Sequence, residues 1–327
     1  MKNQLPLYIF IILCLGIIAY LLPKKENSIS RTDRKDFAVA DTSQINKIIL
    51  TSKAPETAVL ERINKNYWTI NQQYKARKSS IFYILKTLKR MEIAHPVPIS
   101  MRDNVIGNLA VYGIKVEIFL NNGDKKIIYV GGENPELSAT FMLLHGASEP
   151  YAVHIPGFQG YLSSRFFTKE NHWRDKQIMN YDNNNIESVN LKYYDSNKKN
   201  ESFSIKYLDG DYKLFNLNQK DLEPNLTTLK RYLASFRNLY AESFVLESLN
   251  TDSILKTKPF FDLTVNTKDN QKTYLKVFHK RELKNINREL SMRDPERMFV
   301  YVNGKEWMII QLNSFKKVII GLSELRK

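Results

Sequence analysis

Cysteine is almost absent from this chain, which has 327 residues and a single cysteine, Cys14. Because Cys14 lies within an apolar run near the N-terminus, the rest of the chain can form no disulfide and has no cysteine nucleophile. Also missing are the Gly-rich phosphate loop, the GxSxG turn and the HExxH helix, which mark many nucleotide-binding proteins, hydrolases and metalloproteases. The sequence therefore leaves enzymatic activity open, favours a non-enzymatic role and predicts no cofactor.

Acidic residues are also scarce relative to basic ones, with 34 Asp and Glu against 49 Lys and Arg, a net charge of +15. Such a balance allows nucleic acid, anionic lipid or an acidic polymer as a partner. The basic residues are spread along the chain, however, and no known nucleic-acid-binding signature accompanies them. The densest group lies around one expected helix, at Lys75, Arg77, Lys78, Lys86, Lys89 and Arg90. A solvated helix face explains this group, and nucleic acid is not an expected partner.

One long hydrophobic run is present, over residues 5–22, and it contains no charged side chain. Its length is at the short end of what crosses a bilayer as a helix. No small-residue cleavage motif follows it, so it differs from an ordinary secretory signal. We therefore predict an uncleaved transmembrane signal anchor within residues 1–22, followed by a polar linker over residues 23–36.

The chain after the linker shows the same pattern of elements twice. In each half, apolar periodicity predicts three short strands, a helix with one apolar face and two hairpins. The first half places these elements at residues 45–50, 59–62, 67–70, 79–91, 115–132 and 141–155. The second half places them at residues 186–191, 203–206, 212–214, 224–238, 261–278 and 299–312. Hairpin-linked strands pair antiparallel, so we predict the α+β class, with two tandem, related units of about seven strands and one main helix each.

The two units are expected at residues 37–179 and 180–327. Asp209-Gly210 is expected to form a two-residue hairpin turn in the second unit. If the units share one plan, Trp68 and Tyr212 occupy equivalent positions in their third strands.

The two main helices carry recognisable starting residues. Ser79-Ser80 suits the N-terminal cap of the first, and Pro224 suits the first turn of the second. Leu85 and Leu233 are expected to pack each helix on its own sheet.

Aromatic residues, turn formers and histidines are concentrated in residues 139–175. The aromatic side chains there either close one end of a sheet or, together with arginines, line a recognition surface. The candidate binding residues are Tyr151, His154, Gly157, Tyr161, Arg165, Trp173 and Arg174. His145, His154 and His172 with Glu149 match no compact zinc spacing, so no metal site is predicted.

Five segments of the chain resemble a bacterial family called domain of unknown function 4340. They are residues 37–41, HPVPIS at 95–100, GIKVEI at 113–118, EPYAVHIPGFQGYLSSRF at 149–166 and HWRDK at 172–176. The resemblance implies a single-pass, envelope-exposed protein with an accessory role at the membrane, and some relatives occur beside auxiliary subunits of gliding-motility type ABC transporters. It supplies no catalytic residue.

Membrane topology follows from conflicting signals. Basic residues after the run outnumber the positive charges before it, so positive-inside counting alone would keep the body in the cytoplasm. Long domains, however, often translocate regardless of flanking charge. With the resemblance, we expect a protein of the inner membrane whose body faces the periplasm. The expected function is a non-enzymatic binding or scaffold subunit with a protein partner, accessory to a transporter or motility-type complex. The alternative is an envelope enzyme or glycan-binding protein that uses the cluster at residues 151–174.

Overall fold

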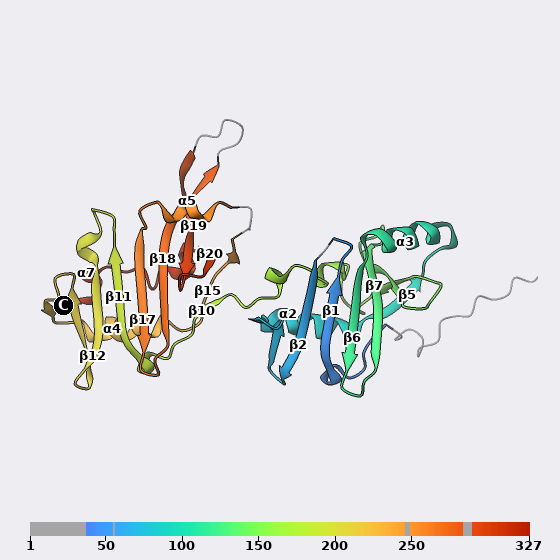
Figure 1. Ribbon diagram of the computed structural model, residues 1–327, viewed down its shortest axis with the longest axis horizontal. Helices are drawn as coiled ribbons and strands as arrows, with labels where there is room; N and C mark the ends of the chain where they lie inside the picture. Colours follow the sequence, from blue (N-terminus) through green and yellow to red (C-terminus); the bar gives the residue numbers. More distant parts are fainter. Residues whose placement is uncertain (1–36, 55, 246–248, 284–289) are drawn as a thin grey trace, which may run out of the picture. The chain divides into compact units, whose positions relative to one another are not determined.

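The computed structural model describes residues 37–54, 56–245, 249–283 and 290–327 (Figure 1). The chain divides into two compact units, of which the first ends at Trp173 and the second begins at Arg174. The expected anchor and linker, residues 1–36, lie outside the described residues. Within the described residues, no helix combines the length and the apolar character needed to cross a bilayer.

The first unit is built on one nine-stranded antiparallel sheet, in the order β4-β3-β2-β1-β6-β7-β8-β9-β5. The strands are β1 (Ile45–Thr51), β2 (Thr57–Asn64), β3 (Tyr67–Ile70), β4 (Tyr74–Lys75), β5 (Glu92–Pro96), β6 (Ile114–Leu120), β7 (Lys125–Glu133), β8 (Thr140–Leu144) and β9 (Tyr151–His154). Its helices are α2 (Lys78–Arg90) and α3 (Ile99–Tyr112), with short 3-10 turns η2 (Thr42–Gln44), η3 (Ser163–Arg165) and η4 (Glu170–His172).

The main core of this unit lies between the sheet and α2. Alternate residues of the strands, such as Ile48 and Leu50, point toward it and are fully buried. On α2, the buried Ile81, Ile84 and Leu88 recur at helical spacing, so one stripe of the helix faces the strands. The segment after β9 closes one end of the same core.

The second unit also contains a nine-stranded antiparallel sheet, in the order β14-β13-β12-β11-β17-β18-β19-β20-β16. The strands are β11 (Ile186–Tyr193), β12 (Phe203–Leu208), β13 (Asp211–Asn216), β14 (Asp221–Leu222), β16 (Ser243–Phe244), β17 (Phe261–Thr267), β18 (Lys272–Leu283), β19 (Leu290–Val302) and β20 (Glu306–Gln311), and β10 (Gln177–Met179) pairs separately with β15 (Leu239–Tyr240). The helices are α4 (Leu226–Ala234), α5 (Thr251–Leu255), α6 (Leu312–Phe315) and α7 (Leu322–Leu325), with 3-10 turns η5 (Asn183–Asn185) and η6 (Lys199–Glu201).

The two sheets follow the same strand order along the chain. Their first strands share an irregularity as well, because the register with the neighbouring strand shifts just after Ile45 in β1 and just after Ile186 in β11. In both units a 3-10 turn capped by an aspartate, Asp41 or Asp182, leads into this strand. The antiparallel α+β class predicted from the sequence is confirmed.

The third strands also correspond. Trp68 in β3 pairs with Arg62, and Tyr212 in β13 pairs with Tyr207, each two positions from a buried aliphatic pair. Trp68 and Tyr212 therefore occupy equivalent positions, as expected. The β12–β13 turn at Asp209-Gly210 has positive φ at both residues, 54° and 93°, which is the backbone of a two-residue type I′ hairpin.

Several features differ from the sequence-based expectation. Each sheet has nine strands rather than seven, because short strands at both edges carry too few residues to show periodicity. The second unit starts at Arg174, before the expected boundary at residue 180, because β10 pairs with β15 of that unit.

The helix starts differ too. The N-cap of α2 is Arg77, whose side chain makes no capping bond, rather than Ser79-Ser80. In α4 the cap is Asn225, whose side chain accepts a hydrogen bond from the Thr228 amide, so Pro224 lies outside the helix. Leu233 is buried against its sheet, and Leu85 is half-buried against the first core.

Candidate functional site

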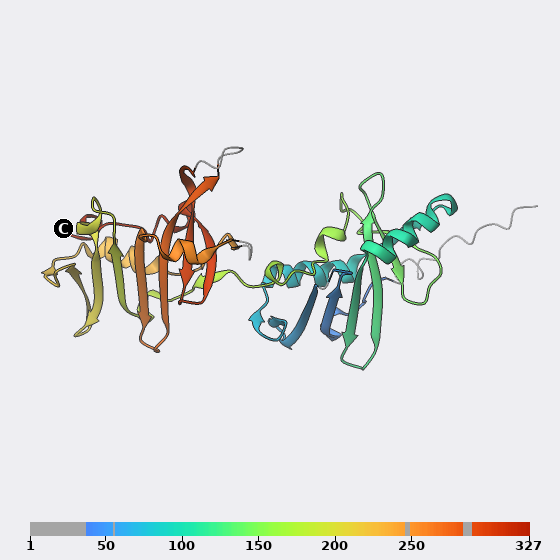
Figure 2. The same cartoon turned by 45° about the horizontal axis from the view of Figure 1, so that its top comes forward.

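The outer face of the first sheet, opposite α2, carries the helix that the sequence analysis did not predict. α3 contacts β7 and lies across one end of that strand (Figure 1, Figure 2). It packs there through Val105 and Leu109, which form a small second core with Phe141 of β8 and Ala152 of β9. Because side chains alternate between the faces of a strand, this core and the main core use different residues of the same strands.

Gly131 of β7 allows α3 to approach the sheet closely. A Cβ atom at this position would lie 2.8 Å from Cδ2 of Leu109 and 3.1 Å from the carbonyl oxygen of Phe141. A glycine inside a strand often marks such a close approach. In the second sheet the equivalent position is Phe278, which is buried with its ring centroid 5.6 Å from that of Trp307. A helix thus covers the outer face of one unit where an aromatic ring fills the other.

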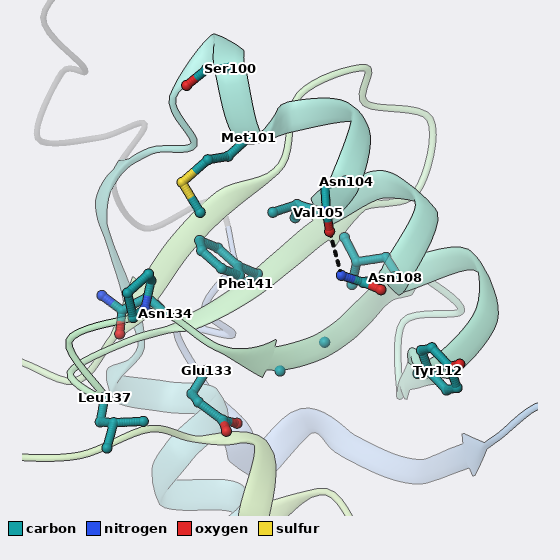
Figure 3. Close-up of a pocket in the computed structure, with 14 residues that line it drawn as sticks. Ser100, Met101, Asn104, Val105, Asn108, Tyr112, Glu133, Asn134, Leu137 and Phe141 are labelled. Carbon is teal, nitrogen blue, oxygen red and sulfur yellow. Dashed lines mark hydrogen bonds between the residues drawn. The ribbon is translucent and has the colours of Figure 1, made fainter.

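A groove of about 620 Å³ lies on one side of α3, and we call it groove A (Figure 3). Val105, Leu109 and Phe141 supply its apolar lining, and Asn104 and Asn108 carry polar groups along its edge. The Asn108 amide nitrogen donates to the Asn104 side-chain oxygen at 2.7 Å (Figure 3). The helix therefore presents apolar carbon to the groove with neutral amides beside it.

The far wall of groove A is the loop between β7 and β8, and Asn134 holds its shape. Its side-chain oxygen accepts from the amides of Ser138 and Ala139 at 2.8 and 2.9 Å. Its side-chain nitrogen donates to Oε2 of Glu136 at 2.7 Å. Asn134 is buried, so these bonds satisfy a side chain that would otherwise be costly to bury. The wall is thus preformed.

A second groove of about 440 Å³, groove B, flanks the other side of α3. Ile106 and Ala110 line groove B, each two positions from the groove A residues Asn104 and Asn108. Two positions are roughly 200° apart around a helix, so the two sets face opposite sides. Leu109 touches both grooves from below. α3 is therefore a ridge between two grooves.

The ridge exposes more apolar surface than a packed helix normally does. Ile99 is 74% exposed, Val111 55% and Tyr112 80%, and Leu137 on the wall of groove A is 54% exposed. A helix with apolar residues on all sides is usually buried on all sides. Val111 and Tyr112 are adjacent at the C-terminal end of α3, and exposed apolar surface beside a groove commonly marks a place where another molecule binds.

The residues predicted as a binding cluster lie elsewhere and do not form one site. Trp173 is fully buried in the main core, and its indole Nε1 donates to the carbonyl oxygen of Phe167 at 3.0 Å. It is therefore a core residue and is not open to a ligand. Tyr151 is half-buried, with its ring edge toward Phe37 at 6.2 Å between centroids. Trp173 and Tyr151 therefore match the interpretation in which the aromatic residues close one end of a sheet.

Arg165 ties η3 to α2. Its guanidinium donates to Oγ1 of Thr87 at 2.9 Å and lies 4.4 Å from the ring centroid of Phe158. Burial lowers the pKa of the Arg165 guanidinium. Tyr161, four residues earlier, is 37% exposed and lies at the surface of the same segment. The arginine thus has a structural partner, while the tyrosine remains accessible.

The other three candidates are separated from these. Gly157 has a φ of 76° in the turn after β9, and His154 is half-buried at the end of that strand, in register with Glu92 of β5. Arg174 belongs to the second unit, where it forms an ion pair with Glu306 and lies over the ring of Phe244. None of the seven candidates lines groove A or groove B.

The histidines weighed as metal ligands are not gathered into a cluster. Within the part of the chain that the structure describes, no group of three or more His, Cys, Asp or Glu side chains is placed to hold a metal ion. His145 lies instead with Nδ1 3.3 Å from the hydroxyl of Tyr129.

A family model described as a domain of unknown function (DUF4340) matches residues 68–259. The chain belongs to this family. The match confirms the resemblance found in the sequence. The matched region contains α3, and it contains the residues of β7 and β8 that line groove A and groove B. No curated protein and no solved structure matches the chain.

Proposed function

We propose that this DUF4340 protein is a membrane-tethered, envelope-facing subunit that binds another protein and catalyses no reaction. The observation that carries the binding role is the apolar ridge of α3 between two grooves. The uncharged run at residues 5–22 supports the tether. A tethered, protein-binding subunit also agrees with the accessory role at the membrane that the family resemblance implies.

The rival proposal, an envelope enzyme or glycan-binding protein, receives less support. Hydrolysis of a glycoside commonly uses two carboxyl groups on either side of the bond that breaks. Of the fourteen residues that line groove A, Glu133 is the single acidic one. In the cluster at residues 151–174, Trp173 is buried and Arg165 is bonded to α2, which leaves few free groups for a sugar.

The envelope location is tested by fusing alkaline phosphatase to Lys327. Because this reporter folds only outside the cytoplasm, we expect an active fusion that stays with the membrane fraction. The matched control fuses a reporter that is active only in the cytoplasm to the same residue, and it should be silent. An inactive phosphatase in a well-expressed fusion would contradict export.

The docking role is tested by photo-crosslinking in living cells. A photoreactive amino acid in place of Tyr112, which is 80% exposed on α3, should give a defined protein adduct. The control position is Leu226, which is 59% exposed on α4 of the second unit. The absence of an adduct at Tyr112, or identical adducts at both positions, would overturn the proposal that this face binds protein.

A further inference from the structure

The side of α2 that faces away from the first sheet is basic, and we call it the α2 outer face. The buried residues of α2 occupy one side of the helix, and its cations recur on the other side at helical spacing. The helix contains no acidic residue, and its exposed cations are Lys78, Lys86, Lys89 and Arg90. Among the described residues, Lys78, Lys86 and Arg90 form no ion pair, and Asp41 is an acidic neighbour of Lys89. The α2 outer face therefore carries charge that the unit itself leaves largely unbalanced.

Two aromatic side chains lie among these cations. Phe82 is 59% exposed and Tyr83 54%, and their rings meet edge to face at 5.5 Å between centroids. Phe82 is four positions from both Lys78 and Lys86, so these three side chains form one row. The Lys86 ammonium lies 5.7 Å from the Phe82 ring centroid. A solvated helix face explains the lysines but not a pair of aromatic rings in water, whereas cations combined with aromatic rings are typical of helices that lie on an anionic bilayer.

The chain enters the first unit beside the last turn of α2. Phe37 is fully buried, and the Val39 amide donates to the carbonyl oxygen of Leu88 at 2.8 Å. Nζ of Lys126 donates to the carbonyl oxygen of Ala38 at 2.7 Å. These contacts fix the point at which the linker joins the unit, and that point lies at the C-terminal end of α2.

The length of the linker keeps α2 near the predicted anchor. Residues 23–36 separate the uncharged run from Phe37, and a chain of this length spans at most about 50 Å when fully extended. α2, with 13 residues, is about 20 Å long, so the whole helix can touch the bilayer that holds the anchor. A short tether gives an effective concentration on the order of millimolar, so a weak attraction is sufficient for docking.

We propose that the α2 outer face docks on the bilayer that holds the anchor, through anionic lipid headgroups. Lys78, Lys86 and Lys89 contact the headgroup phosphates, and Phe82 enters the boundary between headgroups and acyl chains. Because α3 covers the opposite face of the same sheet, this docking turns the α3 ridge away from the membrane and leaves it open to a protein partner. The inference rests on the proposed function, because it requires the membrane tether.

The test uses the full-length protein in nanodiscs of phosphatidylcholine alone, or of equal parts phosphatidylcholine and phosphatidylglycerol. Cys14→Ala removes the native thiol, and Ser79→Cys, at an exposed position of α2, carries a polarity-sensitive fluorophore. We expect blue-shifted emission in the anionic nanodiscs and loss of the shift at high salt, which screens the attraction. Ala110→Cys on α3 is the matched position, because it is also exposed and should report water in both nanodiscs.

Charge removal measures what the lysines contribute. Lys78→Gln, Lys86→Gln and Lys89→Gln together should lower the ratio of docked to free protein by about a hundredfold, at about fivefold for each cation. Glutamine favours helix about as well as lysine, so the fold should persist. Phe82→Ala should lower the ratio by roughly tenfold, because less apolar surface leaves water. The control variant removes the same charge from exposed positions of the second unit and should leave the emission unchanged; it replaces with glutamine Lys230, Lys256 and Lys258.

The docking would be overturned by water-like emission from position 79 in both nanodiscs, by an equal shift in both, or by an equal loss in the control variant. If heparin shifts the emission where anionic lipid does not, the α2 outer face binds an acidic polymer and the lipid proposal is wrong. If the protein does not stay with the nanodiscs, the tether and the docking both fall. If it stays with them while position 79 reports water, the tether stands and the docking alone falls.

Discussion

Trp173→Ala should lower the free energy of unfolding of the first unit by about 3–5 kcal/mol. The side chain is fully buried, its ring lies edge-on to Phe167 at 5.7 Å between centroids, and its Nε1 bond to the Phe167 carbonyl would also be lost. The collapse of so large a cavity is opposed by the surrounding strands and by α2. A urea titration followed by hydrogen exchange of the β1 and β6 amides measures this unit separately.

Tyr161→Ala is the matched control, because Tyr161 belongs to the same segment and is 37% exposed. Its effect on unfolding should stay within about 0.5 kcal/mol. If Trp173→Ala instead left the unfolding free energy unchanged and removed binding to a partner, Trp173 would be a recognition residue rather than a core residue.

Asp294→Ala should destabilise the second unit by roughly 3 kcal/mol. The Asp294 side chain is 1% exposed, and Oδ2 accepts from the Lys280 ammonium at 2.7 Å. Oδ1 accepts from the backbone amides of Glu296 and Arg297 at 2.9 and 3.0 Å. Alanine leaves the lysine and both amides without their acceptor. The loss is measured by urea unfolding with hydrogen exchange of the β17 amides.

The same carboxylate predicts a response to acid. Burial raises the pKa of Asp294, but the Lys280 ammonium and the two backbone amides outweigh burial and hold the pKa below its ordinary value. A carboxyl with a lowered folded-state pKa stabilises the fold fully above its unfolded pKa of about 3.9, and that stability is lost as the pH falls through the folded value. Stability of the second unit should therefore drop below about pH 4. Asp294→Asn should be less stable at pH 7 and should lose less on acidification; an equal loss in both proteins would contradict this role for Asp294.

Much of the sheet architecture could be predicted from the sequence because long strands with one buried face show clear alternation. β11, with Ile186, Val189 and Leu191 buried, is such a strand, and the Asp209-Gly210 turn fixes the β12–β13 hairpin next to it. Edge strands of two residues show no alternation at all. They become strands only by pairing with a neighbour that the rest of the fold has already placed.

The α3 site could not be predicted in the same way. Buried residues of α3 are few, Val105 and Leu109, and its other apolar residues are spread around the helix, so no stripe stands out. The preceding HPVP segment also reads as a loop. One usable signal was present, a run from Ile99 to Tyr112 with no proline and with apolar residues at every helical angle. Groove A in addition needs Phe141, which only the pairing of β7 with β8 brings near α3.

The residues predicted as a binding cluster at 151–174 are not gathered into one open site, and the reason is physical. Aromatic and arginine side chains are equally suited to closing a core and to binding a partner, and sequence spacing does not say which way they point. The structure turns Trp173 inward and bonds Arg165 to α2, while it leaves Tyr161 accessible.

The edge strands of the two sheets limit how copies of this protein can associate. Three of the four outermost strands, β4, β14 and β16, have two residues each, and the fourth, β5, has five and ends at Pro96. Strands this short offer few free amide and carbonyl groups, and proline offers no amide hydrogen, so an incoming strand finds little to pair with. A chain rich in sheet thereby avoids pairing edge to edge into fibrils. The faces of the sheets remain available for assembly, and there the specificity for a partner depends on side chains rather than on the backbone.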